Sequence, residues 1–193
     1  MAKGILILGL NGCGKTTLGR CLAARLGWQH MDAEDYFFLP AEIPFTRSRP
    51  KAEAEALLRA DIARRGDFVL SSVNPDWAGD ILAQCVLAVL LTAPAETRLE
   101  RLDRRERLRF GARVEPGGDM FAAQQRFRAF AAGRDPAEVA QKAEGLGCPV
   151  LRLESTKDVE ALADAVTEAL NGILADVPGE IDGTSAVPPG FSR

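Results

Sequence analysis

The 193-residue sequence contains a single histidine, His30, and no C-x-x-C pair among its four cysteines. One histidine is too few for a multi-histidine metal site, and it argues against a serine or cysteine catalytic triad, which needs a free imidazole as its base. Without C-x-x-C spacing, neither a zinc ribbon nor a dithiol redox motif is indicated. We therefore expect reduced thiols and a chemistry carried by other side chains.

Long apolar runs and a net basic charge are also missing. The longest apolar run, Cys85 to Leu91, is far too short to span a bilayer. The apolar stretch near the N-terminus continues into polar, glycine-rich sequence without a cleavage pattern. The net charge of −3 provides no general basic field for nucleic acid or membrane surfaces. We expect a cytoplasmic protein that binds neither, as a monomer or a homodimer.

Short apolar runs alternate with segments of helical periodicity along most of the chain. Strands are expected at residues 4–8, 28–31, 68–72, 85–91 and 149–153, with helices between and after them. This alternation predicts an α/β fold in which helices cover both faces of a parallel sheet. In such a sheet the ligand site lies outside the carboxyl ends of the strands. We expect one domain over residues 1–175 and a flexible tail over 176–193, where glycine, proline and polar residues gather.

The most specific motif is a glycine-rich loop between the first predicted strand and helix. Residues 9–16 read G-L-N-G-C-G-K-T, which matches G-x-x-x-x-G-K-[ST]. Glycines let successive backbone N–H groups face one centre, and the helix N-terminus adds positive potential toward a phosphate. Lys15 would reach the β- and γ-phosphates of ATP, and the Thr16 hydroxyl would bind Mg²⁺. The predicted nucleotide-binding residues here are Gly9, Asn11, Gly12, Cys13, Gly14, Lys15, Thr16 and Thr17.

An acidic cluster, Asp32, Glu34 and Asp35, follows the second predicted strand. A metal-bound triphosphate needs a carboxylate near the threonine hydroxyl, and the third and fourth predicted strands end in Ser72 and near Thr92 instead. Asp32 is therefore expected to bind Mg²⁺ or a water on it. Glu34 or Asp35 is expected to orient the acceptor hydroxyl and take its proton. Helix capping or simple solvation is the alternative for all three acids.

Residues 98–113 contain seven arginines and no lysine. Guanidinium groups grip phosphate oxygens bidentately, whereas ordinary ion pairing with neighbouring acids is the alternative for part of the set. Gly111 breaks the helical pattern within a segment expected to form a lid at about residues 105–120. Arg113 in this lid would reach the phosphates on closure. An RNA-binding arginine patch is disfavoured, because Phe110 is the one interleaved aromatic residue.

Acceptor-binding residues are expected in two further places. Arg47 and Arg49 lie in a proline-rich excursion at about residues 33–66 and favour an acceptor that bears phosphate or carboxylate. Asn74 and Asp76 follow the third predicted strand, where an acceptor would be contacted. Surface charge and a simple turn are the respective alternatives.

The phosphate loop, the sequence H-M-D-A-E-D at residues 30–35 and the arginine segment together resemble the P-loop small-molecule kinases of the nucleoside-monophosphate-kinase-like group, which includes shikimate, gluconate and adenylate kinases. This resemblance implies a three-layer P-loop NTPase fold with a five-stranded parallel sheet in the order 2-3-1-4-5. It also implies a lid after the fourth strand and an acceptor-binding excursion after the second. By position, it implies that Arg101 stacks on adenine, that Arg105 contacts the transferring phosphate, and that Thr156 lies in the adenine-side loop.

Two departures from shikimate kinases bear on the acceptor. The D-x-D pair of those enzymes is Asp32-x-Glu34 here, and their glycine-rich acceptor loop is replaced by residues 71–76. Both shikimate and gluconate are therefore disfavoured as acceptors. The expected activity is Mg²⁺-dependent transfer of the ATP γ-phosphate to a small molecule, with catalytic residues Lys15, Asp32, Glu34, Asp35, Arg105 and Arg113. A nucleoside monophosphate kinase and a regulatory ATPase that engages a protein partner are the alternatives.

Overall fold

Five parallel strands form a single sheet in the order β2-β3-β1-β4-β5. The computed structural model describes residues 2–156 and 158–176. The strands are β1 (Gly4–Leu8), β2 (Gln29–Asp32), β3 (Phe68–Ser72), β4 (Cys85–Thr92) and β5 (Val150–Glu154). The expected fold class and strand order are confirmed. The tail expected at residues 176–193 lies, apart from Asp176, outside the described residues.

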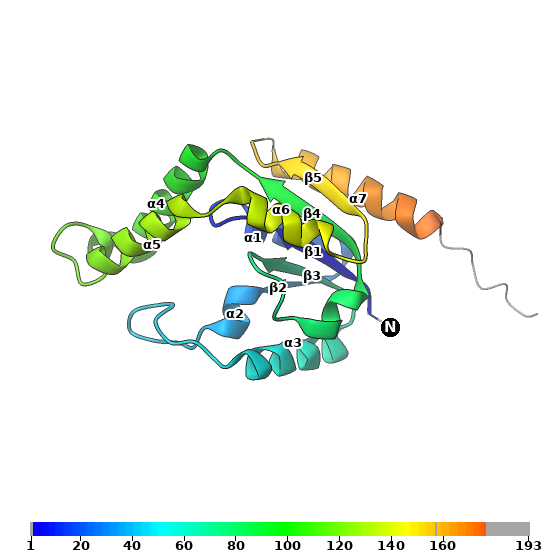
Figure 1. Ribbon diagram of the computed structural model, residues 1–193, viewed down its shortest axis with the longest axis horizontal. Coiled ribbons are helices and arrows are strands. Elements are labelled where there is room, and N and C mark those ends of the chain that lie inside the picture. The colour runs from blue at the N-terminus through cyan, green and yellow to red at the C-terminus, as the bar shows by residue number, and fades with distance from the viewer. Residues whose placement is uncertain (1, 157, 177–193) are drawn as a thin grey trace, which may run out of the picture.

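Helices cover both faces of this sheet (Figure 1). They are α1 (Lys15–Leu26), α2 (Ala33–Phe37), α3 (Lys51–Arg65), α4 (Ala95–Phe110), α5 (Phe121–Gly133), α6 (Pro136–Glu144) and α7 (Val159–Ala175), with 3₁₀ turns η1 (Gly79–Gln84) and η2 (Gly111–Val114). In Figure 1, α6 lies in front of the sheet, and α1 and α7, which contact each other, lie behind it. Among the described helices, none is long and apolar enough to cross a membrane.

The central strands form the core. Every side chain of β1 and β3 is buried, because each strand has a neighbour on both sides and helices above and below. Ser71 and Ser72 end β3 as buried polar residues, and each satisfies its hydroxyl by donating to a backbone carbonyl: Ser71 to Lys15 at 3.2 Å and Ser72 to Asn74 at 2.7 Å. The carboxyl end of β3 is thereby tied to the segments that form the site.

One predicted strand boundary moves for a local reason. The second strand begins at Gln29 rather than at residue 28. The N–H of Trp28 donates to the carbonyl of Ala23 at 3.0 Å and so belongs to the end of α1. Gly27, in the left-handed conformation with φ of 68°, makes this turn possible.

Two segments extend from the carboxyl edge of the sheet in the same direction: the α4–α5 hairpin and the loop at residues 38–50 (Figure 1). They contact each other at two points. Arg113 Nη2 donates to the Glu42 carbonyl at 3.2 Å, and the Arg109 guanidinium lies 5.5 Å from the centre of the Phe45 ring. The segment expected as a lid, about residues 105–120, is the outer half of α4 with η2 and the turn before α5.

Candidate active site

The glycines of the phosphate loop allow the close approach of neighbouring backbone. Gly12 and Gly14 have φ values of 84° and 92°, which are strained for other residues. A Cβ at Gly12 would lie 2.3 Å from the Arg98 carbonyl oxygen, and one at Gly9 would lie 2.4 Å from that of Leu91. The loop is therefore fixed against β4 and α4 with its backbone at the carboxyl edge of the sheet. Cys13 is buried within the loop, and burial raises the pKa of its thiol.

The buried side chain of Arg98 contacts the phosphate loop from the interior of the protein. Its side chain is 2% exposed, and Nη1 donates to the carbonyls of Asn11 at 3.2 Å and Ala131 at 3.4 Å. It thus joins the phosphate loop to α5 through α4. Among the seven arginines of the segment, this one packs inside the protein, a distinction that spacing alone did not reveal.

Lys15 and Thr16 begin α1 at the centre of the site. Lys15 Nζ donates to the Leu10 carbonyl at 3.3 Å. Burial lowers the pKa of its ammonium, whereas Cys13, Glu34 and Asp32 favour the charged form. A half-buried ammonium with these partners is well suited to a bound anion. Thr17, in the first turn of α1, is exposed.

Asp32 connects two helices. Its Oδ2 accepts a 2.7 Å hydrogen bond from Thr16 Oγ1, and its Oδ1 accepts one of 3.1 Å from the Glu34 N–H at the start of α2. The capping alternative therefore holds alongside the predicted proximity to Thr16. The Thr16 hydroxyl and the Asp32 carboxylate offer oxygen atoms of the kind that Mg²⁺ binds together with phosphate and water. Among the described residues, no group of three or more His, Cys, Asp and Glu side chains forms a separate metal cage.

Glu34 and Asp35 point to different places. Burial, and then the neighbouring Asp32, raise the pKa of Glu34, while Arg105 and Lys15 act in the opposite direction. Glu34 lines a cavity between the α4–α5 hairpin and the loop at residues 38–50. Asp35 is exposed and lines a separate hollow with His30 and Asp61. Of the two expected bases, only Glu34 faces the cavity beside the phosphate loop.

The other arginines expected to contact the nucleotide or the transferring phosphate are held in three different ways. Arg105 lines the cavity and pairs with buried Glu106, with Nη2 2.7 Å from Oε1. Arg101 donates to the hydroxyl of Ser155 at 2.8 Å and to its carbonyl at 2.7 Å, which places it beside Gly14 and next to exposed Thr156. Arg113 pairs with Asp119 at 2.7 Å, and with Glu42 it joins the α4–α5 hairpin to the loop at 38–50.

Arg47 and Arg49 do not lie in the cavity. Arg47 is exposed. Arg49 Nη1 donates to the carbonyls of Tyr36 at 2.9 Å and Phe38 at 3.2 Å, and Nε pairs with Glu53 at 3.3 Å. The end of a helix leaves carbonyls without intrahelical partners, and Arg49 supplies their donors. Neither of the two arginines that favoured an anionic acceptor therefore lines the cavity, and Arg49 instead stabilises the segment at residues 33–66.

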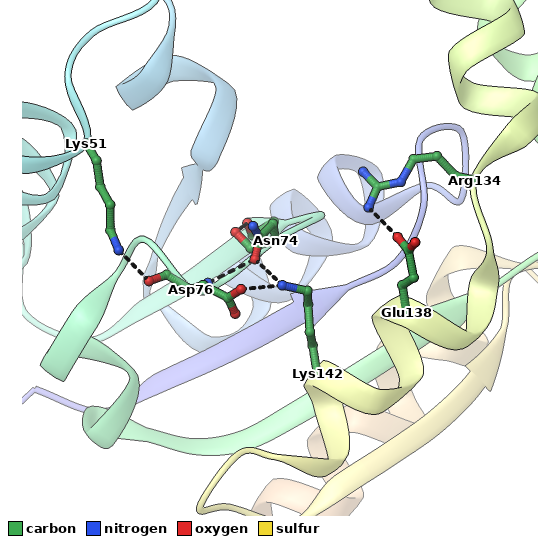
Figure 2. A network of polar contacts seen from close by, with 7 residues as sticks. Lys51, Asn74, Asp76, Arg134, Glu138 and Lys142 are labelled. Atoms are coloured by element: carbon green, nitrogen blue, oxygen red, sulfur yellow. Dashed lines mark hydrogen bonds and ion pairs between the residues drawn. The ribbon is translucent and has the colours of Figure 1, made fainter.

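Asn74 and Asp76 belong to a polar network between β3 and α6 (Figure 2). Asn74 Oδ1 accepts from the Asp76 N–H at 3.1 Å and from Lys142 Nζ at 2.9 Å, and Lys142 also pairs with the Asp76 carboxylate. Lys51 Nζ donates to the Asp76 carbonyl at 2.9 Å. Asn74 lines the cavity, whereas Asp76 orients it from outside. No motif marked Lys142, which comes from a helix distant in sequence.

A cavity of about 490 Å³ lies between the two projecting segments, next to the phosphate loop. We call it the aromatic cavity. Seven aromatic side chains line it, out of nine phenylalanines, two tryptophans and one tyrosine in the chain. They are Phe37, Phe38, Phe45, Trp77, Phe110, Phe127 and Phe130. Sequence reasoning missed this feature, because these residues are dispersed over five segments and none forms a local pattern.

Comparisons with known proteins agree with this geometry. The AAA domain family model matches residues 5–109. The uncharacterized protein YqaC of Bacillus subtilis is 34% identical over 179 residues, which cover 89% of this chain and 99% of that protein. The shikimate kinase of Moorella thermoacetica is 34% identical over 115 residues, 52% of this chain and 64% of that enzyme.

Solved structures show the same fold. A sugar kinase from Janibacter sp. HTCC2649 superimposes with a TM-score of 0.54 at 16% identity, covering 89% of this chain and 95% of that one. The expected resemblance to P-loop small-molecule kinases is thereby confirmed.

Proposed function

The chain belongs to the AAA domain family, and from this starting point we propose that it is an ATP-dependent, Mg²⁺-requiring kinase that phosphorylates a small molecule. The observation that carries this proposal is the position of Glu34. It lines the aromatic cavity and lies close enough to Lys15 and Arg105 for their charges to oppose the rise of its pKa. Glu34, the proposed base, therefore lies both at the cavity proposed for the acceptor and near the lysine of the phosphate loop.

In the proposed reaction, the acceptor hydroxyl oxygen attacks the γ-phosphorus of ATP. The bond from that phosphorus to the bridging oxygen breaks, ADP leaves, and the hydroxyl proton passes to the Glu34 carboxylate. Lys15 and Arg105 compensate the negative charge on the transferring group. The raised pKa of Glu34 suits it to this role, because a base works best with a pKa nearer to neutral pH.

Thr16 and Asp32 would hold the magnesium ion, which when bound supplies positive charge to the phosphate oxygens. Arg101, fixed by Ser155 beside the phosphate loop, together with Thr156 would bind the adenine side of ATP. Arg113 would act when the α4–α5 hairpin closes, because in this structure Asp119 and Glu42 occupy its donors. A regulatory ATPase needs no acceptor cavity beside its phosphates, so the aromatic cavity favours transfer over that alternative.

The test is a screen of metabolites and nucleosides as acceptors, read by ADP release with Mg²⁺ present. Lys15→Ala and Arg105→Ala should abolish acceptor phosphorylation, and Lys3→Ala, at an exposed position away from the site, should not. ATP turnover that no acceptor changes and that neither substitution reduces would contradict the proposal.

A further inference from the structure

The charges that line the aromatic cavity are balanced. Its charged residues are Glu34, Glu106, Arg105 and Arg134. Arg105 is paired with Glu106 at 2.7 Å, and Arg134 pairs with Glu138 at 3.5 Å while its guanidinium lies 5.6 Å from the centre of the Phe130 ring. Since Arg105 pairs with Glu106 and is assigned to the transferring phosphate, and Arg134 pairs with Glu138, the cavity offers no further positive charge for an anionic group on the acceptor. An acceptor phosphate or carboxylate buried here would therefore lose its hydration without sufficient compensation.

The aromatic walls of the cavity favour a flat, apolar ligand. Phe37 meets Trp77 edge to face with ring centres 4.8 Å apart, and Phe38 meets Phe45 in the same way at 5.2 Å. Phe45 and Phe130 remain 38% and 58% exposed at the rim. A polyol would bury hydroxyl groups against these rings, whereas an aromatic ligand would stack on them and cover the exposed surface.

Unpartnered polar atoms lie in the same walls. Within residues 2–156 and 158–176, the buried side-chain polar atoms without a hydrogen-bond partner are Asn11 Oδ1, Trp77 Nε1 and Gln124 Nε2. All three residues line the aromatic cavity. Buried polar atoms normally have partners, so a ligand that displaces the side chains covering these three atoms would gain by supplying the partners that they lack. The heteroatoms of a heteroaromatic ligand could accept from Trp77 Nε1 and Gln124 Nε2 and donate to Asn11 Oδ1.

From these three observations we infer that the acceptor is an uncharged alcohol carried on a heteroaromatic body. The ring system occupies the aromatic cavity, and the hydroxyl reaches Glu34 at the end nearest the phosphate loop. This inference rests on the proposed function and specifies its substrate class. Nucleosides and simple heteroaromatic alcohols share the required chemistry, while sugar acids and nucleoside monophosphates do not.

The test compares matched acceptors in the full-length protein. One arm uses nucleosides, a second uses pyridinemethanols, and the third uses nucleoside monophosphates, shikimate and gluconate. ADP release should give a kcat/KM at least tenfold higher for one of the first two arms than for the third, and the better arm identifies the source of the heteroaromatic alcohol. Binding is measured separately by Trp77 fluorescence in a Trp28→Phe background, where saturable quenching by the same alcohols is expected.

A variant pair ties the effect to the cavity. Phe127→Leu keeps an apolar side chain but removes a ring, so KM for the alcohol should rise by roughly fivefold with little change in kcat. Leu108→Ala, at a side chain that is 79% exposed on α4, should change neither. Preference for the monophosphates, shikimate or gluconate would overturn the inference and leave phosphotransfer standing. Failure of every acceptor and of ATP binding would instead refute the proposed function, and the fluorescence titration would still decide the cavity ligand.

Discussion

Thr16 Oγ1 donates a 2.7 Å hydrogen bond to Asp32 Oδ2, and this contact joins the first turn of α1 to the end of β2. The two residues are 16 positions apart in the chain. Because the other oxygen of Asp32 caps α2, one carboxylate contacts the Thr16 hydroxyl, where the proposed magnesium ion would bind, and also fixes the start of the helix that carries Glu34.

Asp32→Asn should separate the two roles of this residue. Asparagine is as good a helix N-cap as aspartate, so α2 should stay in place and the melting temperature should change little. Loss of the negative oxygen should raise the Mg²⁺ concentration for half-maximal activity by roughly ten- to hundredfold. A magnesium titration of ADP release checks this. Asp135→Asn, at the N-cap of α6, is the matched control, and an unchanged titration for Asp32→Asn would refute the metal assignment.

Glu34→Gln should remove activity and stabilise the protein. Because the folded-state pKa of Glu34 lies above its usual value, the ionised form is disfavoured by folding, and stability falls as pH rises through that pKa. Glutamine resembles the protonated form, so the free energy of unfolding at neutral pH should increase. Activity in the native protein should be lost as pH falls through the same raised pKa, which a carboxyl NMR titration measures. The control is Glu168→Gln on exposed α7 surface, and an active or less stable Glu34→Gln protein contradicts the assignment.

Arg98 and Arg105 should give opposite outcomes although they lie two helical turns apart. Arg98→Met leaves the carbonyls of Asn11 and Ala131 without this donor and should lower the free energy of unfolding by about 3 kcal/mol. Arg105→Lys, at an exposed side chain beside the cavity, keeps a positive charge next to buried Glu106 and should largely keep the melting temperature, while loss of the guanidinium fork should reduce kcat by about two orders of magnitude. Urea unfolding and steady-state kinetics on both variants decide the question. Equal stability losses would show that Arg105 is structural too.

His30 should make stability depend on pH. Burial lowers the pKa of its imidazole, and Nε2 lies 3.0 Å from Ser71 Oγ. The unfolded chain therefore binds a proton more readily, so stability should decline as pH falls below about 6.5, the ordinary histidine value, until the folded-state pKa is reached. Since the chain has no other histidine, the difference between native protein and His30→Gln isolates this effect. Parallel stability curves for the two proteins between pH 5 and 7 would disprove it.

The phosphate loop and the strands followed from the sequence, because each depends on residues that are close in the chain. The placement of Asp32 followed from its position at the end of a predicted strand. Strand 68–72 and the segment of residues 9–16 carry their conformation in local apolar runs and glycines, and the carboxyl ends of parallel strands must share one edge. The sheet order came from the resemblance to a family rather than from periodicity. The sequence also marked residues 98–113 as exceptional, although not which arginine does what.

The tertiary structure alone decided which side chains line the cavity beside the phosphate loop. Both Arg98 and Arg105 belong to α4, but Arg98 is buried while Arg105 lines the cavity, because different segments of the chain surround the two positions. Arg49 donates to carbonyls at the end of α2. The aromatic cavity and the contact of Lys142 with Asn74 join segments far apart in the chain. Local spacing fixes backbone conformation, whereas the partner of a side chain depends on which distant segments the fold brings beside it. This is why the aromatic cavity, on which the proposed acceptor class rests, was not predictable from the sequence.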